Sequence, residues 1–341
     1  MSRSLPVLAP LADSFSRRVS YLRVSLTDRC NYRCTYCMPE EGVDLVPRAE
    51  VLTLEELGRV IELLARVGVR RVRLTGGEPT VRHGLVDLIE RLAAFGLDDL
   101  AMTTNGHTLA EIAPSLKRAG LARLNISVDT LDGEKFRRIT RWGDLGRVQA
   151  GVAAAAQAGF VGTKINVVAL AGFNDFELPS LAEWSWSQGA VPRYIEWMPM
   201  GSGSLFAPGA FLAAAEIRAR LSAAFGSLAI DDGNGLPGVG PARYLRVENG
   251  AWAGRLIGII SAVSEPFCET CNRVRLSSTG QLHTCLARDE TVDLRTLLRD
   301  GLDDRTILDR VRAGVAVKAE GHEFKPSGCG GPRKHMVSIG G

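Results

Sequence analysis

The sequence lacks an excess of charge of either sign. Its 341 residues include 41 Lys and Arg against 38 Asp and Glu, which leaves a formal net charge of +3. A general role that depends on bulk attraction to nucleic acid or to a membrane surface is therefore excluded, although a local basic cluster can still bind an anion.

Long apolar runs are also missing. No stretch approaches the ~20 consecutive apolar residues that a membrane-spanning helix needs. The apolar segment near the N-terminus, residues 5–12, is broken by Pro6 and Pro10, so we expect no signal peptide and a cytoplasmic location. The chain is 45% hydrophobic and long enough for one large domain or two unequal ones, each with its own core.

Cysteine is scarce, and its odd count of seven excludes a fully paired disulfide scaffold. The cysteines fall into two groups of three and one single residue: Cys30, Cys34 and Cys37; Cys268, Cys271 and Cys285; and Cys329. In a long chain without an export signal, such grouping indicates metal or redox chemistry. We interpret Cys329 as a packed or surface thiol.

Each group offers three thiols, and this number restricts the kind of metal centre. Three thiolates suit a [4Fe–4S] cluster with one iron left open, because complete protein ligation takes four. Structural zinc sites use four ligands, commonly in C-x2-C pairs. Two alternatives therefore stay open: a zinc site shared between the groups, and a zinc ribbon that uses the second group.

Five glycines mark a repeated pattern in which a helical run ends and a short strand follows. They are Gly68, Gly96, Gly120, Gly159 and Gly189. Glycine ends a helix readily because it adopts the left-handed conformation without steric penalty. Together with a first strand over residues 21–26, the pattern predicts six strands with helices between them. Such alternation gives a parallel sheet with right-handed crossovers, either barrel-like or open and doubly wound.

The strands alternate between apolar and polar residues. In the first strand Leu22, Val24 and Leu26 oppose Arg23 and its polar neighbours, and the sixth strand places Tyr194, Glu196 and Met198 together. Parallel strands covered on both faces are usually apolar throughout, and buried polar groups cost free energy unless they are paired. We therefore predict a curved sheet whose inner face lines a polar cavity. Exposed strands of an antiparallel sheet are the alternative.

The pattern changes near residue 200. We divide the chain into an N-terminal segment (1–19), an incomplete (β/α)6 barrel of TIM type (20–200), a β-rich C-terminal extension that closes its side and carries the second cysteine group (201–317), and a tail (318–341). A last helical stretch is expected over about 294–311. The tail is basic, rich in glycine and ends in Gly340 and Gly341.

Unusual residues follow the carboxyl ends of the predicted strands, where barrel enzymes keep their chemistry. The first cysteine group follows strand one, Gly-Gly-Glu-Pro (76–79) follows strand two, and Thr-Thr-Asn-Gly (103–106) ends strand three. Ser127 and Asp129 end strand four. The diglycine would let a ligand approach the backbone closely.

With these motifs the sequence resembles the radical S-adenosylmethionine superfamily. C-x3-C-x2-C with Tyr36 before its last cysteine, followed by Gly-Gly-Glu-Pro, is the hallmark of that superfamily. The second group, C-E-T-C-N-R-V-R with a later cysteine, and the terminal Gly-Gly are similar to the GTP 3′,8-cyclase family of molybdenum cofactor biosynthesis. Thr80 departs from that family, which more often has an apolar residue there.

The resemblance implies a set of site residues. It implies two [4Fe–4S] clusters, one on Cys30, Cys34 and Cys37 and one on Cys268, Cys271 and Cys285. Further positions would bind S-adenosylmethionine (Tyr36, Gly77, Ser127 and Met198) or GTP (Arg23, Arg73, Thr103, Lys164, Arg273 and Arg275). Gly340 and Gly341 match a tail that reaches the active site.

The resemblance also implies an activity and its partners. A 5′-deoxyadenosyl radical would abstract the ribose 3′ hydrogen of GTP, and the 3′ carbon would then attack C8 of guanine. An electron donor would be required, and the product would pass to the cyclic pyranopterin monophosphate synthase. We expect a monomer or homodimer and no contact with nucleic acid or membrane. Two rival readings remain: a radical enzyme that modifies peptides, and a non-catalytic zinc-binding protein.

Overall fold

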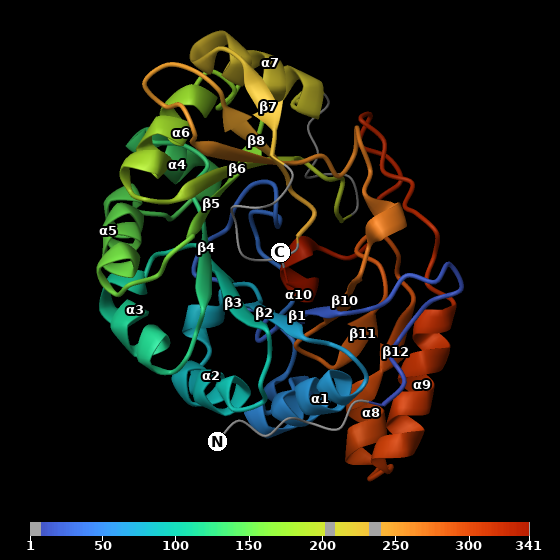
Figure 1. The fold of residues 1–341 in the computed structure, drawn as a ribbon. Coiled ribbons are helices and arrows are strands. Elements are labelled where there is room, and N and C mark those ends of the chain that lie inside the picture. Colours follow the sequence, from blue (N-terminus) through green and yellow to red (C-terminus); the bar gives the residue numbers. More distant parts are fainter. Residues whose placement is uncertain (1–7, 202–208, 232–239, 341) are drawn as a thin grey trace.

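In the part of the chain that the structure describes, a single sheet of twelve strands organises the fold (Figure 1). The structure is a computed structural model and describes residues 8–201, 209–231 and 240–340. The strands are β1 (Tyr21–Ser25), β2 (Arg71–Thr75), β3 (Asp99–Thr104), β4 (Arg123–Ser127), β5 (Lys164–Ala169), β6 (Val191–Glu196), β7 (Leu228–Ile230), β8 (Arg243–Val247), β9 (Leu256–Ile260), β10 (Arg273–Leu276), β11 (Gln281–His283) and β12 (Thr291–Asp293).

Helices follow the first six strands and cover the outer side of the sheet, while the short helix α10 (Met336–Ile339) lies on its inner side (Figure 1). They are α1 (Leu54–Arg66), α2 (Leu85–Ala93), α3 (Leu109–Arg118), α4 (Gly133–Thr140), α5 (Leu145–Gln157), α6 (Leu178–Ser187), α7 (Ala214–Phe225), α8 (Leu294–Arg299), α9 (Asp304–Ala316) and α10 (Met336–Ile339). Strands β1 to β6 pair in sequence order, all parallel. This confirms the predicted six-stranded partial barrel.

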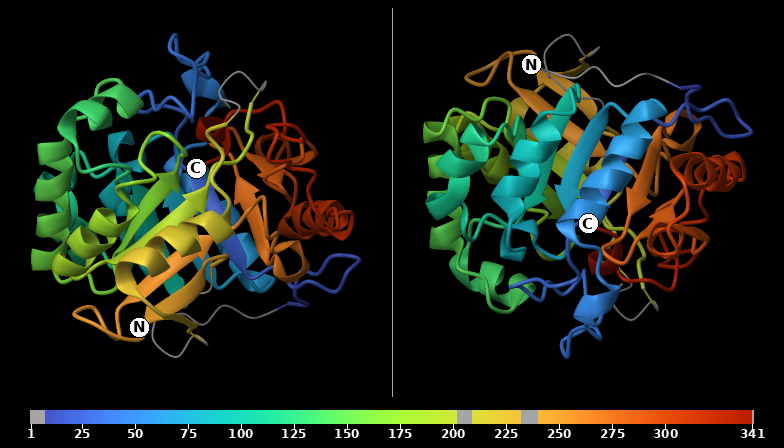
Figure 2. Two further views of the ribbon diagram at one scale, coloured as in Figure 1. Left: turned by 90° about the horizontal axis from the view of Figure 1, so that it is seen from above. Right: turned by 90° about the horizontal axis from the view of Figure 1, so that it is seen from below.

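The C-terminal extension adds strands to both edges of the parallel sheet. At one edge β10 runs parallel to β1 and leads to antiparallel β11 and β12. At the other edge β9 runs parallel to β6 and leads to antiparallel β8 and β7. In Figure 2, α8 and α9 lie on the opposite side of the molecule from α3 and α5. The extension therefore widens the sheet at both edges, and the barrel stays open.

Local signals in the sequence set the helix ends as expected. All five joint glycines have positive φ, from +66° at Gly96 to +101° at Gly68. Helix α1 begins with a reciprocal cap, in which Thr53 Oγ1 accepts from the Glu56 amide at 3.1 Å and Glu56 Oε2 accepts from the Thr53 amide at 2.8 Å. Such caps satisfy amides that have no partner within the helix.

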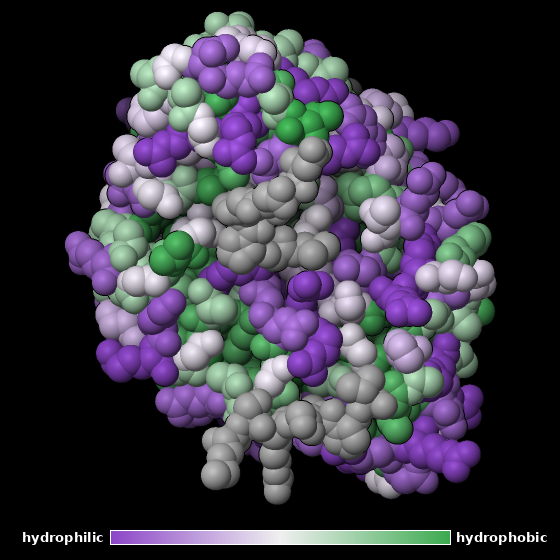
Figure 3. Space-filling model, in the orientation of Figure 1, coloured by the Kyte–Doolittle hydropathy of each residue, from purple (hydrophilic) through white to green (hydrophobic). Residues whose placement is uncertain are grey.

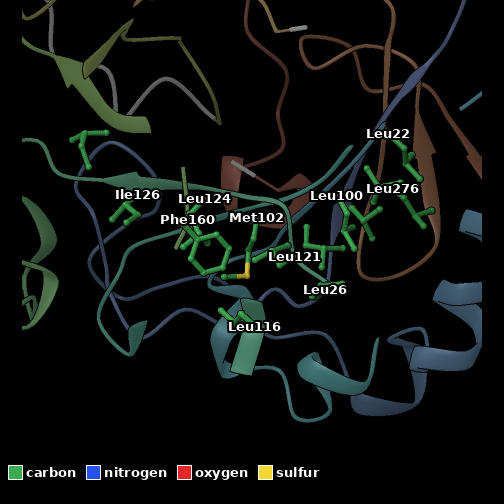
Figure 4. Packing of buried hydrophobic residues seen from close by; sticks show 14 of the residues in the cluster. Leu22, Leu26, Leu100, Met102, Leu116, Leu121, Leu124, Ile126, Phe160 and Leu276 are labelled. Carbon is green, nitrogen blue, oxygen red and sulfur yellow. The ribbon is translucent and has the colours of Figure 1, made fainter. Parts of the chain in front are cut away.

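The main core lies between the outer face of the sheet and the helices. Figure 4 shows part of this cluster, with Met102 beside Phe160 and with Leu22 near Leu276, and these side chains are at most 5% exposed. Leu276 of β10 joins the same cluster. Because side chains alternate along a strand, the residues between these apolar positions point to the inner face.

Two sequence expectations change in the structure. The stretch 294–311 forms two helices, because Gly301 adopts φ +74° and Asp303 caps α9 through the Thr306 amide at 2.7 Å. In β6, Tyr194 does not share the inner face: it is fully buried in the core and its hydroxyl donates to the Leu178 carbonyl oxygen at 2.5 Å.

The outer surface mixes hydrophilic and apolar residues, as the face in Figure 3 shows. Within the described part of the chain, no helix has both the length and the apolar composition that crossing a bilayer requires.

Candidate functional site

A cavity at the carboxyl ends of the parallel strands brings both cysteine groups together. Six thiols line it, three from the loop after β1 and three from the segment around β10 and β11: Cys30, Cys34, Cys37, Cys268, Cys271 and Cys285. All six are free and partly buried, whereas Cys329 is free and exposed. The sheet therefore places two triads, far apart in sequence, around one space.

The first triad is carried by a loop that is tied to its neighbours. The amides of Arg33 and Thr35 donate to the carbonyls of Thr140 and Ile139, at the end of α4, at 3.0 and 2.8 Å. Asn105 Nδ2 donates to Asn31 Oδ1 at 2.7 Å. These contacts tie the cysteine loop to the end of α4 and to the loop after β3.

The thiols of the first triad interact with one another. Burial raises the pKa of Cys30 to about 11 and that of Cys37 to about 12. The pKa of Cys34 is also raised, mainly by burial and then by the neighbouring Cys37 and Asp129. Thiols whose pKa is raised in this way form thiolates more readily when a cation compensates their charge, and a metal centre would supply that charge.

The diglycine of Gly-Gly-Glu-Pro lets the β2 loop pack against the cysteine loop. The Gly77 amide donates to the Thr27 carbonyl at 2.7 Å and the Glu78 amide to the Arg29 carbonyl at 2.8 Å. A Cβ on Gly77 would lie 2.3 Å from the Arg29 carbonyl oxygen. The glycines are thus required by the close approach of two backbones as well as by any ligand.

Glu78 joins its own loop after β2 to the loop at the end of β3, and it lines the cavity. Its carboxylate accepts from Thr80 Oγ1 and Thr104 Oγ1, each at 2.7 Å, and from the Asn105 amide at 2.7 Å. Glu78 is 1% exposed, and burial raises its pKa. Thr80, the position that departs from the family pattern, therefore adds a hydrogen bond to this hub.

Tyr36 is held at the cavity wall by a buried carboxylate. Its hydroxyl donates to Asp129 Oδ2 at 2.8 Å, and the Val168 amide donates to Asp129 Oδ1 at 2.8 Å. Burial raises the pKa of Asp129 to about 6. The aromatic ring just before Cys37 is therefore fixed in position.

The second triad has a different electrostatic environment. Burial raises the pKa of Cys268, and Cys285 and Cys271 raise it further. Burial would also raise the pKa of Cys271, but the cations of Lys318 and Arg273 outweigh it and hold that pKa below the ordinary value. The three thiols again interact with one another, this time beside positive charge.

Three arginines form a row across neighbouring strands between the triads. Arg23 of β1 is in register with Arg73 of β2 on one side and Arg275 of β10 on the other. Burial lowers the pKa of Arg23 well below its usual range, and Arg275 and Arg73 lower it further. The row is a strongly cationic strip on the inner face, of the kind that attracts a polyanion.

A fourth arginine, which the sequence analysis missed, continues this surface. Arg193 of β6 is 4% exposed and donates to Asn166 Oδ1 at 2.8 Å and to Asn125 Oδ1 at 3.1 Å. Burial lowers its pKa to about 10, and Arg73 adds to that shift. The feature that identifies Arg193 is its position opposite Asn166 in the sheet. This position is defined only by the pairing of β5 with β6, which the sequence alone does not give.

Lys164 lies deeper than the cavity lining. Lys164 is 3% exposed, and its ammonium donates to the Gly162 carbonyl at 3.3 Å. Burial lowers the pKa of Lys164 to about 7, and repulsion from Arg123 and Arg193 adds to this shift. Close to it, Arg123 Nε donates to Asp99 Oδ1 at 2.8 Å. The other GTP positions expected from the sequence (Arg23, Arg73, Thr103, Arg273 and Arg275) line the cavity itself.

The C-terminal tail enters the cavity region. Arg275 Nη1 donates to the Gly340 carbonyl, and a Cβ on Gly340 would lie 2.0 Å from Thr75 Oγ1. Glycine at this position therefore permits the close approach. Gly341 lies outside the described residues. Tyr36, Gly77, Ser127 and Met198, the positions expected to hold S-adenosylmethionine, all line the cavity.

The residues fit iron–sulfur chemistry better than a single-ion site. In residues 8–201, 209–231 and 240–340, no three His, Cys, Asp or Glu side chains converge closely enough to hold one metal ion. A cluster distributes its cysteines over separate irons, so its thiols need not converge on one point. Three free, mutually interacting thiols on one cavity wall meet that requirement at each triad.

Comparisons with known proteins identify two family models in this chain. The model of the radical SAM superfamily matches residues 24–185, and the model named Molybdenum Cofactor Synthesis C matches residues 191–324. Together they span both cysteine triads.

Curated relatives match over nearly the whole chain. A GTP 3′,8-cyclase of Rhodopseudomonas palustris is 45% identical over 319 residues, which cover 92% of this chain and 90% of the relative. A GTP 3′,8-cyclase of Caulobacter vibrioides is 44% identical over 336 residues, covering 97% and 94%. Among solved structures, Streptococcus suis SuiB bound to S-adenosylmethionine has a TM-score of 0.62 at 14% identity, covering 86% of this chain and 68% of that one. This last likeness concerns the fold alone.

Replacing Gly77 with Ala should distort the first cysteine loop. The new Cβ would meet backbone atoms of Arg29, which cannot move without the loop. We expect the free energy of unfolding of the metal-free protein to fall by about 1–3 kcal/mol, with loss of iron from the first triad. Urea unfolding and iron analysis measure both effects. Gly133→Ala, whose Cβ would enter open space, is the control, and equal stability of the two variants would contradict the packing argument.

Lys164→Met should change the pH dependence of stability. The pKa of Lys164 in the folded protein, about 7, lies below the usual value of 10.5. The buried charge therefore destabilises the folded state most below pH 7, and this destabilisation decreases as the pH rises and the lysine loses its proton. The stability advantage of Lys164→Met over the wild type should therefore shrink by roughly 3 kcal/mol between pH 6 and pH 9. Denaturant unfolding of the metal-free proteins measures it, with Lys325→Met as an exposed control. A difference that is independent of pH would contradict the assignment.

Proposed function

Because the chain belongs to the radical SAM superfamily and, within it, to the GTP 3′,8-cyclases, we propose that its cavity binds S-adenosylmethionine beside the first cysteine triad and GTP beside the second. The enzyme converts GTP to (8S)-3′,8-cyclo-7,8-dihydroguanosine 5′-triphosphate, the first step of molybdenum cofactor biosynthesis. We propose a role in this reaction for individual residues of the cavity.

The first triad would hold a [4Fe–4S] cluster and place the cofactor against it. When bound, this cluster supplies the electron that cleaves S-adenosylmethionine and so yields the 5′-deoxyadenosyl radical. Tyr36 is fixed by Asp129, and Gly77 leaves room near the cysteine loop. With Ser127 and Met198 these residues line the same wall. Their task is to orient the cofactor and to keep water from the radical.

The single observation that carries the substrate assignment is the row Arg73–Arg23–Arg275. Neighbouring strands lie about 4.8 Å apart, so the row presents guanidinium groups at short intervals along one line. A triphosphate satisfies several such cations through charge-assisted hydrogen bonds. Anion binding would also relieve the mutual repulsion that lowers the pKa of Arg23.

Buried polar atoms around the row support a ligand at this position. Arg73 Nε, Tyr21 Oη and Thr103 Oγ1 are buried and have no hydrogen-bond partner in the described part of the chain. Because buried polar groups are normally paired, these atoms are candidates to contact GTP. All three residues line the cavity.

The second triad would hold a second [4Fe–4S] cluster whose open iron binds the guanine base. The support is its thiol count, the mutual interaction of Cys268 with Cys285 and Cys271, and its place on the cavity wall that also carries Arg273 and Arg275. GTP would then be held at both ends, by arginines at the triphosphate and by iron at the base. We propose that Gly340, whose carbonyl accepts from Arg275, borders this side of the cavity.

The remaining proposals concern the setting of the reaction. The reaction needs an electron donor, and its product would pass to the cyclic pyranopterin monophosphate synthase. We place the enzyme in the cytoplasm, where a reducing environment keeps thiols free for metal binding. We also propose a monomer or homodimer, with residues 20–200 as the barrel and 201–317 as the extension.

Anaerobic incubation with dithionite, S-adenosylmethionine and GTP tests the substrate assignment. We expect 5′-deoxyadenosine to form while GTP is consumed. Chromatography measures the amounts of 5′-deoxyadenosine and GTP. Formation of 5′-deoxyadenosine without GTP consumption would overturn the substrate assignment.

Arg73→Met should weaken GTP binding while cleavage of the cofactor continues. Loss of one charge-assisted contact costs about 2 kcal/mol, which corresponds to a Kd for GTP that is about 30-fold higher. Anaerobic calorimetry measures the Kd. Arg70→Met is the matched control, because Arg70 pairs with Asp98 outside the cavity at 3.3 Å. An unchanged Kd in Arg73→Met would remove Arg73 from the GTP site.

A further inference from the structure

A buried lysine outside the family motifs contacts the second triad. Lys318 is 3% exposed, although the sequence places it at the start of a basic tail. Its ammonium donates to Cys271 Sγ at 3.4 Å, to the Arg273 carbonyl at 2.9 Å and to the Thr284 carbonyl at 2.5 Å. An ammonium has three donors, so all of them are used at this one place.

The acceptors of Lys318 lie on both chain segments that carry the triad. Arg273 begins β10 two residues after Cys271, and Thr284 directly precedes Cys285. One ammonium therefore joins the segment of Cys271 to the segment of Cys285. A buried charge that holds two carbonyls and a thiol is costly unless every contact is made, which makes the position of Lys318 highly specific.

Cys268, the remaining cysteine of the second triad, is held by a cation from near the N-terminus, Arg17. Arg17 Nη1 donates to the Cys268 carbonyl at 2.8 Å and to the Glu320 carbonyl at 2.6 Å, and Arg17 Nη2 donates to the Ala319 carbonyl at 2.6 Å. Arg17 is 8% exposed. Its planar fork thus ties the first cysteine of the triad to the segment that follows Lys318.

Arg17 is itself fixed by a preformed turn. Arg17 Nε pairs with Asp13 Oδ2 at 2.6 Å, and Asp13 Oδ1 accepts from the amides of Phe15 and Arg17 at 3.0 and 2.9 Å. The Ser14 amide donates to the Ala316 carbonyl at the end of α9 at 3.3 Å. The N-terminal turn and the exit of α9 therefore meet behind the second triad.

The segment 318–322, which we call the strap, runs along the triad. The strap begins with Lys318, and the next two residues accept from Arg17. Gly321 follows, where a Cβ would lie 3.8 Å from Cys268 Sγ. The backbone amide of His322 forms a hydrogen bond with the Cys268 thiol. The strap thus contacts Cys271 at its beginning and Cys268 at its end.

We propose that Lys318 and Arg17 are positioning residues that hold the strap against the second triad and allow it to bind its cluster. In the loaded protein Lys318 donates a hydrogen bond to the sulfur of Cys271, and Arg17 fixes the Cys268 loop through its carbonyl. Hydrogen bonds and positive charge at cluster sulfurs raise the reduction potential. This inference rests on the proposed second cluster.

Lys318→Met tests the contact of the ammonium with the triad. Two carbonyls and a sulfur lose their donor, so we expect about four of the about eight irons of the loaded chain to be lost. The first cluster should keep its electron paramagnetic resonance signal and its cleavage of S-adenosylmethionine. Lys325→Met, at an exposed lysine of the same tail, is the matched control. Full iron content in Lys318→Met with an unchanged reduction potential would overturn the proposal.

Lys318→Gln separates charge from hydrogen bonding and decides the matter if Lys318→Met does not fold. The amide keeps donors for the carbonyls but removes the charge, so the second cluster should remain with a lower reduction potential. An unchanged potential in Lys318→Gln would mean that Lys318 serves the fold alone.

Arg17→Lys tests the second cation, with exposed Arg18→Lys as its control. A single ammonium cannot reproduce the planar fork that reaches Asp13, Cys268 and the strap together. We expect partial loss of iron from the second triad and none from the first. Unchanged iron content would exclude Arg17 from the proposal.

A chain carrying Cys268→Ser, Cys271→Ser and Cys285→Ser distinguishes failure of this inference from failure of the proposed second cluster. If that chain still holds about eight irons, the second cluster is wrongly assigned. If it loses four while the Lys318 variants behave as the wild type, only the roles of Lys318 and Arg17 are wrong.

Discussion

The parallel pairing of β10 with β1 is the constraint on which the site depends. It sets Arg275 beside Arg23, which β2 already places beside Arg73, and it carries the second cysteine triad to the cavity of the first. The buried Arg73 and Arg275 and the partly buried Arg23 between them repel each other, so the fold must stabilise this arrangement with apolar contacts made elsewhere. The opposite face of the same strands supplies them, since Leu22 and Val24 of β1 are fully buried beside Val274 and Leu276 of β10.

The cations of the cavity are held largely by neutral acceptors. Arg193 is bound by the amide oxygens of Asn125 and Asn166, and Arg275 by the carbonyl of Gly340. Such contacts fix the direction of a guanidinium group without cancelling its charge. Asp99 and Arg123, which form a buried ion pair, lie at the opposite ends of their strands from the cavity. The positive charge is therefore preserved where an anionic substrate would bind, and its electrostatic cost is recovered when that substrate binds.

The sequence predicts those parts of the fold that depend on local chemistry. Glycines end the helices because of their own φ, and the two-residue period of β1 separates Arg23 from Leu22 wherever the strand lies. The inner position of Arg193 could not be predicted in this way, because the pairing of β5 with β6 decides which residues of β6 face the cavity. Lys318 and Arg17 look like ordinary surface cations in the sequence. Their burial results from contacts with segments 47 and 251 residues away.

The two triads differ in the sign of the charge around them. Near the first triad, burial raises the pKa of Cys30 and Cys34, and the carboxyl groups of Glu78 and Asp129, which line the wall, raise it further. Near the second, Lys318 and Arg273 lower the pKa of Cys271. S-Adenosylmethionine carries a sulfonium and an ammonium group, whereas GTP carries a triphosphate. Under the proposed assignment, the carboxyl groups beside the first triad would favour the sulfonium and ammonium groups of the cofactor, and the arginine row would favour the triphosphate of GTP.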